Sequence, residues 1–472
     1  MDLHYLTASQ AQALFAAKEL SPVELLDAVV SRAKDVEPLV NALTEQMLDE
    51  AYACAREAER RYVGTGPTPR ALEGIPLITK EEQPIAGRTL EEGSLLEKGR
   101  IADVTHPVVE RVQAAGAVVH ARSATPEFSI AAFTHTKLWG VTRNPWNLQA
   151  APGGSSGGAG AVLAAGETVL ATGSDIGGSI RIPSSFCGVV GFKPPFGRVP
   201  GLPPFQADTY CADGPMARSV ADVALLQNVL AGPHPHDPAS LRPGYAVPTV
   251  HAPATGMRVG LCLNLGDYLV DPVIEANTRA AADALRAAGV IVDEVTLPWH
   301  RKELLTAAWA HFGAVFGPFV DDILDGAAAE QAMPYTLEFA ARAAGAASYA
   351  EGLRLEADLY RPLGELLERN DALLCPTLAT TAIPADAASL DELVDVGNET
   401  LPWPETLMTL PFNVIGRAPV LALPSGTAAN GIPTGVQIVG RTYDDETVFR
   451  LGAVLERELA LWTTNDWWPT LR

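Results

Sequence analysis

The sequence predicts an α/β protein in which helices cover both faces of a β-sheet. Short apolar, strand-like runs alternate along the chain with runs of helical periodicity, as expected when helices connect the strands of such a sheet. The 472 residues, 47% of them hydrophobic, are enough to bury a large core.

The N-terminal region predicts three helices. Thr7-Ala8-Ser9-Gln10 and Ser21-Pro22-Val23-Glu24 are both typical of capping boxes, and the second also has proline at the first helical position. Two amphipathic helices should therefore begin at these points. We expect the third helix near residues 48–61.

The alternation of strands and helices follows after residue 80. The strand-like runs are Ala117–Ala121, Val169–Thr172, Val189–Phe192 and Ala418–Leu423, and the helix-like runs are Pro107–Ala115, Gly160–Ala165 and Ser219–Leu230.

Three further stretches are distinctive. Residues 232–256 are rich in proline, histidine and alanine and predict a surface linker, and residues 379–404 predict another long loop. The longest apolar run, from Leu304 to Val320, is 17 residues long and too short for a typical membrane span. We interpret it as one buried helix beside a pocket and expect no membrane insertion.

Two glycine-rich runs point to the functional site. Ala151-Pro152-Gly153-Gly154-Ser155-Ser156-Gly157-Gly158 is followed by Gly173-Ser174-Asp175-Ile176-Gly177-Gly178-Ser179-Ile180-Arg181, so two serines lie 24 positions apart in glycine-lined turns. Glycine lets the backbone approach a ligand closely, and two Gly-Gly-Ser turns suggest main-chain N–H groups held around a reacting oxygen.

Two common glycine motifs fit these runs poorly. A phosphate loop needs Gly-Lys-Ser/Thr at its end, and Gly158-Ala159-Gly160-Ala161-Val162-Leu163 breaks the dinucleotide fingerprint at its last position. Gly153-Gly154-Ser155-Ser156-Gly157 matches the Gly-x-Ser-x-Gly nucleophile elbow, but a turn-like segment and no strand precedes it. An α/β-hydrolase also needs a late histidine, and the last of the nine histidines is His311.

A lysine offers a base of another kind. Gly74-Ile75-Pro76-Leu77-Ile78-Thr79-Lys80 places Lys80 at the end of a short apolar run. Burial disfavours the ammonium form of a lysine, and a neutral amine can accept a proton. Taken alone, such a lysine is more often solvated at the end of a strand.

The residues Lys80, Ser155 and Ser179, spaced by 75 and 24, resemble the Ser-Ser-Lys triad of the amidase signature hydrolases. The similarity extends through Ile182-Pro183 to Phe186-Cys187-Gly188-Val189-Val190-Gly191-Phe192-Lys193-Pro194 and includes Gly435-Val436-Gln437-Ile438-Val439-Gly440 near the C-terminus. It covers most of residues 1–240 and 370–460. The resemblance is to members of the fatty acid amide hydrolase type and to soluble bacterial amidases and urethanases.

The resemblance implies a mechanism. Ser179 would be the nucleophile that forms an acyl-enzyme, and Ser155, preceded by a cis peptide bond, would relay protons between Ser179 and Lys80. The backbone N–H groups of Ile176, Gly177, Gly178 and Ser179 would form the oxyanion hole. The chain departs from the family pattern at one position, because the residue that follows the lysine is usually aspartate and this chain has Glu81, then Glu82.

Neighbouring residues have supporting roles in this interpretation. Ser156, Asp175 and Arg181 would orient the triad through hydrogen bonds while also satisfying the glycine-rich backbone. The five cysteines, at positions 54, 187, 211, 262 and 375, show no metal-binding pattern, and Cys187 is expected to be a small buried residue. We expect no metal and no cofactor, and structural or pocket-lining roles for the histidines at 106, 120 and 135.

The family resemblance also implies the architecture, a large mixed central β-sheet sandwiched by α-helices. We predict a single domain over residues 1–472, with the signature core at about 70–230 and a variable, substrate-shaping region at about 232–410. A boundary between the halves would divide one sheet.

The expected substrate is a small amide or carbamate. The pocket should draw on Arg88–Leu95, Ile130–Leu138, Leu202–Cys211, Trp309–Phe319 and Trp403–Phe412. Its aromatic candidates are Phe133, Trp139, Phe205, Tyr210, Trp309, Phe316, Trp403 and Phe412. An apolar pocket favours aryl or alkyl amides, and the same triad can attack urethanes, although any single ring could belong to the core.

Two other functions stay open. The chain could be the glutamine-dependent subunit of an amidotransferase, although Pro194-Pro195-Phe196-Gly197-Arg198-Val199-Pro200-Gly201 departs from the usual pattern of that subunit. It could also be a non-catalytic binding protein that has kept the signature, which the intact triad disfavours.

Charge and composition bear on partners and location. The net charge of −22 and isoelectric point near 4.8 disfavour nucleic acids and anionic membrane surfaces as partners. Met1-Asp2-Leu3-His4 lacks the features of a signal peptide, and unpatterned cysteines fit a reducing compartment, so we expect a cytoplasmic protein. A homodimer remains open.

Overall fold

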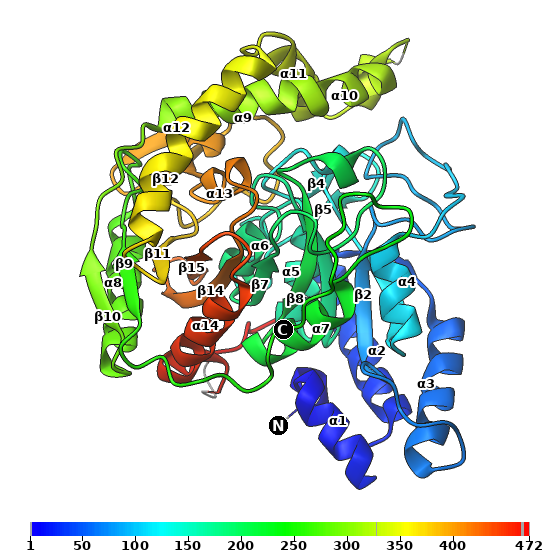
Figure 1. Cartoon of the computed structure of the whole chain (residues 1–472). Coiled ribbons are helices and arrows are strands. Elements are labelled where there is room, and N and C mark those ends of the chain that lie inside the picture. The colour runs from blue at the N-terminus through cyan, green and yellow to red at the C-terminus, as the bar shows by residue number, and fades with distance from the viewer. Residues whose placement is uncertain (1, 327, 464–466, 472) are drawn as a thin grey trace.

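The computed structural model describes residues 2–326, 328–463 and 467–471, and a mixed sheet of eleven strands runs through its centre (Figure 1). The strand order is β1-β3-β2-β6-β8-β7-β14-β15-β11-β9-β10. Parallel pairing joins β2 to β3 and to β6 on one side and β9 to β10 and to β11 on the other, while the middle pairs are antiparallel. The predicted fold class, a large mixed sheet flanked by helices, is confirmed.

The sheet draws its strands from almost the whole length of the chain. In chain order its strands are β1 (Leu43–Gln46), β2 (Pro76–Lys80), β3 (Val118–Ser123), β6 (Leu170–Asp175), β7 (Val190–Lys193), β8 (Ala212–Ala217), β9 (Arg258–Leu261), β10 (Ile291–Glu294), β11 (Ala372–Pro376), β14 (Val420–Thr427) and β15 (Pro433–Gly440). Two small hairpins lie outside it, β4 (His135–Thr136) with β5 (Gly140–Val141), and β12 (Leu393–Val396) with β13 (Glu399–Pro402).

Helices follow most strands. They are α1 (Ala8–Ala17), α2 (Pro22–Val40), α3 (Leu48–Val63), α4 (Pro107–Ala114), α5 (Gly157–Ala165), α6 (Arg181–Cys187), α7 (Val220–Leu230), α8 (Pro272–Ala287), α9 (Arg301–Val315), α10 (Gly317–Leu324), α11 (Pro334–Ala344), α12 (Tyr349–Leu367), α13 (Pro411–Val414) and α14 (Asp445–Leu459). In Figure 1, α9 to α12 gather at one end of the molecule, away from α1 to α4.

The local sequence signals for helix starts are confirmed. Thr7 caps α1 and Ser21 caps α2, and both form the reciprocal capping box with the residue three positions later. The third predicted helix corresponds to α3. Every strand-like run predicted after residue 80 overlaps a strand of the central sheet.

Two expectations about irregular regions need correction. The run from Leu304 to Val320 forms two helices, α9 and α10, which meet at Phe316 because Gly317 and Pro318 begin a new helix with proline in its first turn. The predicted loop at 379–404 contains the β12–β13 hairpin. Residues 232–256 contain no helix or strand, in agreement with the predicted linker.

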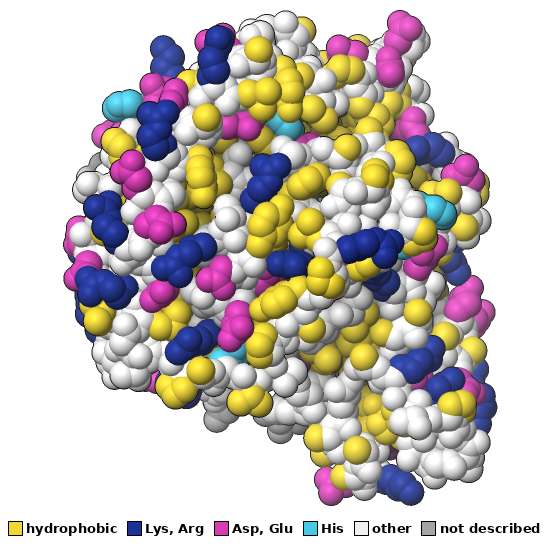
Figure 2. All heavy atoms as spheres, viewed as in Figure 1, with side chains coloured by type: hydrophobic (Ala, Val, Ile, Leu, Met, Phe, Trp, Pro, Cys, Tyr) yellow, Lys and Arg dark blue, Asp and Glu magenta, His cyan; other side chains and the backbone are white. Residues whose placement is uncertain are grey.

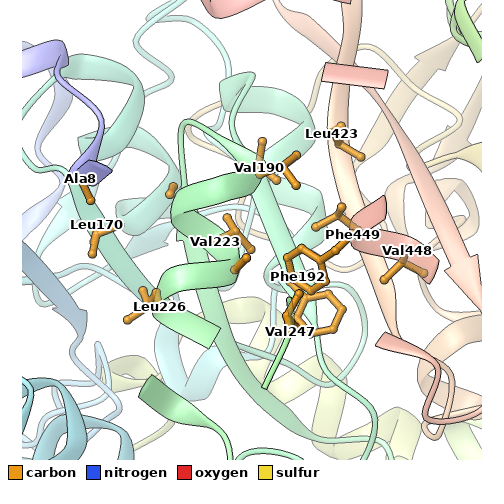
Figure 3. Packing of buried hydrophobic residues seen from close by; sticks show 14 of the residues in the cluster. Ala8, Leu170, Val190, Phe192, Val223, Leu226, Val247, Leu423, Val448 and Phe449 are labelled. Carbon is orange, nitrogen blue, oxygen red and sulfur yellow. The ribbon is translucent and has the colours of Figure 1, made fainter. Parts of the chain in front are cut away.

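The largest buried cluster packs helices α1, α7 and α14 against the middle of the sheet. Figure 3 shows Phe192 of β7 against Phe449 of α14, whose ring centroids are 4.7 Å apart, with Val223 and Leu226 of α7 nearby. A second cluster joins α9, α11 and α12 to the region around Phe412. These two cores hold the sheet and the outer helices in fixed positions around the glycine-rich turns.

The surface agrees with the acidic composition. On the face shown in Figure 2, acidic and basic side chains are interspersed, and the described residues there form no continuous basic stripe. Among the described residues, no helix is both long enough and apolar enough to cross a bilayer.

Candidate active site

The sheet brings the lysine and the second glycine-rich turn to the same edge. Strands β2 and β6 are parallel neighbours, and Lys80 is the last residue of β2 while Asp175 is the last residue of β6. The carboxyl ends of parallel strands meet at one edge of a sheet, where α/β proteins commonly place their ligands. This pairing explains how residues 80 and 175 become neighbours.

The first glycine-rich turn holds Ser155 against this edge. The peptide bond between Gly154 and Ser155 is cis, as predicted. A Cβ atom on Gly154 would lie 2.5 Å from the carbonyl oxygen of Ala131, so a larger residue does not fit there. Gly153 adopts a φ of +92°, which also favours glycine. The turn then leads directly into α5.

Lys80 is completely buried and has three polar partners. Its Nζ atom lies 2.7 Å from Ser155 Oγ, 3.0 Å from Ser174 Oγ and 3.0 Å from Glu82 Oε1. The solvated lysine that is the commoner outcome for such a sequence is therefore excluded. The sequence analysis assigns no role to Ser174 or Glu82, although Ser174 directly precedes Asp175 and Glu82 lies two positions after Lys80.

Glu82 is held as a carboxylate by its surroundings. Burial alone would raise the pKa of Glu82, but the charge of Lys80 and hydrogen bonds from Ser129, Ser174 and Lys80 outweigh it and lower the pKa. Ser129 donates to the second carboxylate oxygen of Glu82 and is itself 2.8 Å from Thr125 Oγ1.

Ser179 is joined to the first turn through the backbone. The N–H of Ser156 donates to the Ser179 carbonyl at 3.1 Å, and Ser179 lines the same pocket as Gly154. Within the residues that the structure describes, Ser179 Oγ has no hydrogen bond to Ser155 or Lys80.

One of the four N–H groups expected to form the oxyanion hole, that of Gly178, already has an acceptor within the protein. The N–H of Gly178 donates to Asp175 Oδ1 at 2.9 Å, because the carboxylate folds back over the turn. The N–H groups of Ile176, Gly177 and Ser179 donate to no acceptor among the described residues. Three of the four expected donors remain available for an oxyanion.

A buried network anchors the turn that carries Ser179. Arg181 donates to both oxygens of Asp175, at 2.9 and 3.0 Å, and to Gln437 and Asn413 at 2.9 and 2.7 Å. Burial alone would raise the pKa of Asp175, but the charge of Arg181 and hydrogen bonds from Arg181 and Asn413 lower it. Both partners are fully buried, and they fix the turn that carries Ser179.

Asn413 and Gln437 contact the buried Asp175–Arg181 pair, and the sequence assigns no role to either of them. Asn413 Nδ2 contacts Asp175 Oδ1 at 2.8 Å and the Tyr210 carbonyl at 3.1 Å, and Gln437 also donates to the carbonyls of Pro376 and Met408. Gln437 lies in the family-like segment Gly435–Gly440, which was a usable signal. Nothing local in the sequence marks Asn413.

Ser156 links the two turns. Its Oγ donates to the Ser174 carbonyl at 3.2 Å and accepts from the Ser174 N–H at 3.3 Å. Ser156, Asp175 and Arg181 therefore all form hydrogen bonds within the two glycine-rich turns.

The pocket beside Ser179 is apolar. It is lined by Ser129, Ile130, Ala131, Ala132, Gly154, Ile176, Gly177, Ser179, Ile182, Leu305, Trp309, Phe312, Phe316, Phe339, Leu390, Trp403, Pro404, Leu407 and Leu410. Among these described residues there is no charged side chain.

The aromatic candidates divide between pocket and core. Three line the apolar pocket, namely Trp309, Phe316 and Trp403. Phe133, Tyr210 and Phe412 are buried in the core, and Trp139 lies outside the pocket. The contribution of Phe339 was not predicted, because α11 lies far from the signature segments in the chain.

A second, more polar cavity lies on the Ser155 side. Its lining includes Glu82, Glu92, Arg100, Asp213 and His106 together with Ser155, Ser174 and Phe205. Burial raises the pKa of Glu92 to about 7, and Arg100 counteracts this rise. Burial also raises the pKa of Asp213. His106, whose Nε2 lies 3.5 Å from Asp213 Oδ2, opposes this rise.

The remaining candidates have structural contacts. Cys187 is fully buried as expected, and burial raises the pKa of its thiol. His106 caps α4, His120 contacts the Glu167 carbonyl at 3.0 Å, and His135 contacts the Ala387 carbonyl at 3.1 Å. Among the described residues, no group of three His, Cys, Asp or Glu side chains is arranged to hold a metal ion.

Comparison with known proteins gives consistent matches over nearly the whole chain. The sequence model of the Amidase family matches residues 24–449. The chain is 36% identical to the A subunit of glutamyl-tRNA(Gln) amidotransferase from Roseiflexus sp. (strain RS-1), covering 98% of this chain and 97% of that protein.

Two solved structures are similar throughout. A bacterial aryl acylamidase of the amidase signature family superposes with a TM-score of 0.90 at 27% identity, covering 98% of both chains. The A subunit of glutamyl-tRNA(Gln) amidotransferase from Thermotoga maritima superposes with a TM-score of 0.77 at 26% identity, covering 97% of this chain and 95% of that one.

Proposed function

This chain belongs to the Amidase family of amidase signature enzymes, which act on C–N amide bonds, and from that premise we propose that it hydrolyses small aryl or alkyl amides or carbamates. The proposal concerns the substrate class and the roles of individual residues.

The apolar pocket beside Ser179 carries this proposal. Leu305, Trp309, Phe312, Phe316 and Phe339 line it, together with Trp403, and no charged side chain is among its described residues. An aromatic ring or alkyl chain gains free energy by leaving water for such a surface. The α-ammonium and α-carboxylate of glutamine would find no countercharge there.

In the proposed reaction, Ser179 Oγ attacks the carbonyl carbon and passes its proton to Ser155, which passes a proton on to Lys80. The N–H groups of Ile176, Gly177 and Ser179 stabilise the tetrahedral oxyanion. The proton then returns through Ser155 to the leaving nitrogen, and water hydrolyses the acyl-enzyme. A carbamate carbonyl is attacked in the same way.

A second candidate function is favoured by the sequence relatives. Proteins named as the A subunit of glutamyl-tRNA(Gln) amidotransferase match at up to 36% identity over almost the full length. Under this alternative the chain would use glutamine as its amide substrate within a complex. The similarity to the aryl acylamidase structure, with the higher TM-score, supports the first candidate.

The test measures release of 4-nitroaniline from an acyl 4-nitroanilide and from an O-alkyl N-(4-nitrophenyl)carbamate. Wild type and Ser179→Ala are compared, and ammonia release from glutamine is followed in parallel. Cleavage of either chromogenic compound by wild type but not by Ser179→Ala supports the proposal. Ammonia from glutamine without cleavage of either compound would replace it with the amidotransferase role, and the anilide-to-carbamate ratio decides between amidase and urethanase.

A further inference from the structure

The environment of Lys80 contains one group that the Ser-Ser-Lys mechanism does not use. Glu82 Oε1 lies 3.0 Å from Lys80 Nζ, whereas the side chain of Lys80 is completely shielded from solvent. A carboxylate at this distance favours the ammonium form of a lysine. The base expected from the sequence, a neutral amine produced by burial alone, therefore needs another explanation in this chain.

The contacts of Lys80 suit both of its protonation states. An ammonium group has three N–H donors, and Ser155 Oγ, Ser174 Oγ and Glu82 Oε1 provide three acceptors at 2.7, 3.0 and 3.0 Å. A neutral amine can accept from Ser155 through its lone pair while its two N–H groups donate to Ser174 and Glu82. The heavy atoms can stay in place when the proton moves, and only the amine rotates about its Cε–Nζ bond.

Glu82 also connects this buried group to water. Its side chain is 17% exposed, and it lines the polar cavity that Ser155 and Ser174 border. Its second oxygen accepts from Ser129, which fixes the orientation of the carboxylate. Among the described residues, Glu82 is the acidic side chain that contacts Lys80.

We propose that Glu82 extends the triad to a four-residue proton relay, in which the paired Lys80 and Glu82 together form the proton acceptor. This inference rests on the proposed function of Lys80, Ser155 and Ser179. Lys80 first passes a proton to Glu82, which frees the lone pair of its amine, and rotation about the Cε–Nζ bond turns that lone pair toward Ser155. As the Ser179 Oγ–C bond forms, the Ser155 proton then moves to Lys80 and the Ser179 proton to Ser155. When the C–N bond breaks, a proton returns from Glu82 to Lys80 and from Lys80 to Ser155, and Ser155 gives its proton to the leaving nitrogen while Ser179 stays acylated.

The pH profile of Glu82→Gln distinguishes this role from simple stabilisation of the ammonium. In the relay, the Lys80–Glu82 pair of the wild type can accept a proton as long as Glu82 is ionised. The acidic limb of the wild-type kcat/KM profile therefore lies at low pH. Glutamine cannot accept the proton, so Lys80 must first lose one to solvent, and the acidic limb of kcat/KM should move to higher pH. If Glu82 only stabilised the ammonium, its loss would move that limb to lower pH.

Other charged groups around Glu82 are unchanged in this comparison. Glu92, paired with Arg100, and Asp213, beside His106, face the same cavity, and the thiol of Cys211 is also close enough to interact. Because wild type and variant share all of them, the difference between the two profiles reports on position 82.

The experiment measures kcat and KM for the 4-nitroanilide from pH 5 to 10, with thermal melting of each variant. We expect Glu82→Gln to lower kcat at pH 7 at least about tenfold with little change in KM, and Glu82→Asp to be intermediate. Glu91→Gln is the matched control, since it removes a carboxylate from the same loop and its amide oxygen can still accept from Gly99.

The result that overturns the proposal is an acidic limb of Glu82→Gln that is unmoved or moves to lower pH. If Glu82→Gln does not fold, Glu82→Asp decides, and a wild-type kcat in that variant contradicts the relay. Failure of the proposed function itself would be seen separately, as absence of cleavage by wild type or undiminished cleavage by Ser179→Ala.

Discussion

The carboxylate of Asp175 and the guanidinium of Arg181 form a completely buried ion pair with two hydrogen bonds, at 2.9 and 3.0 Å, across the turn that carries Ser179. The same carboxylate accepts the N–H of Gly178, so one ion pair both stabilises the turn and removes one donor from the expected oxyanion hole.

Arg181→Met should therefore be strongly destabilising. It leaves the Asp175 carboxylate buried without its countercharge, and breaking a buried pair in this way typically costs about 3–5 kcal/mol. Urea denaturation measures the loss. Arg279→Met is the control, since Arg279 pairs with Glu275 and Glu294 at the surface and should change stability little. Equal effects in the two variants would contradict the importance of the buried pair.

Lys80→Met should impair amide hydrolysis more than ester hydrolysis. An amine leaves only after protonation, whereas an alkoxide or phenolate needs less help, and a positioned acid–base group typically contributes about 10²–10⁴-fold. The measurement compares kcat/KM for a matched 4-nitroanilide and 4-nitrophenyl ester. Equal losses for both substrates would argue against proton transfer through Lys80.

Two adjacent glycines in the turn that carries Ser179 should respond differently to substitution by alanine. At Gly178, with a φ of +123°, a Cβ would lie 2.1 Å from Thr409 Oγ1, so Gly178→Ala should destabilise the fold by at least about 1–2 kcal/mol. At Gly177 a Cβ would meet Leu410 and Phe312 at 3.8 and 4.0 Å, which are ordinary contacts.

Gly177→Ala should consequently keep the wild-type melting temperature while its methyl group narrows the apolar pocket beside Ser179. Melting and kcat/KM for the anilide are measured for both variants. A folded, fully active Gly178→Ala would contradict the close packing of this turn.

The apolar pocket predicts a difference between two aromatic residues. Phe312→Ala removes a ring that lines the pocket near Gly177, and kcat/KM for aryl substrates should fall roughly 10- to 100-fold. Trp139→Phe changes a ring outside that pocket and should leave kcat/KM near its wild-type value. A comparable loss in Trp139→Phe would show that the sequence-based assignment of this residue to the pocket was right.

Glu167 should make the stability of the protein depend on pH. Its carboxylate is fully buried and lies beside the carboxylate of Glu37. Burial and the nearby charge of Glu37 raise the pKa of Glu167 well above its usual value. The folded state therefore holds this proton more tightly, and the contribution of Glu167 to stability is lost as the pH rises above about 4.5.

Glu167→Gln removes this dependence. The melting temperature of the variant minus that of wild type should increase from pH 5 to pH 8. Glu19→Gln, a change at an exposed carboxyl, should give a difference that stays flat. If the melting-temperature difference between Glu167→Gln and wild type did not change with pH, burial would not raise the pKa of Glu167, and this prediction would be wrong.

Local sequence signals were sufficient for much of the fold. The capping boxes at Thr7 and Ser21 predict the starts of α1 and α2 because both partners of each box lie within four residues. The continuous apolar run from Leu304 to Val320 predicts one helix, but the structure has a break between α9 and α10. Gly317 and Pro318 mark this break locally, and apolar periodicity alone does not reveal it.

The sequence by itself determined the fold class, the catalytic candidates Lys80, Ser155 and Ser179, and the cis bond before Ser155, because these depend on runs of neighbouring residues or on a resemblance carried by them. Only the tertiary structure decided which groups surround Lys80 and that the N–H of Gly178 donates to the Asp175 carboxylate. It also decided that Asn413, Gln437 and Phe339 complete the site. Hydrogen bonding and burial join side chains that lie up to 256 positions apart, and no local pattern encodes such distances.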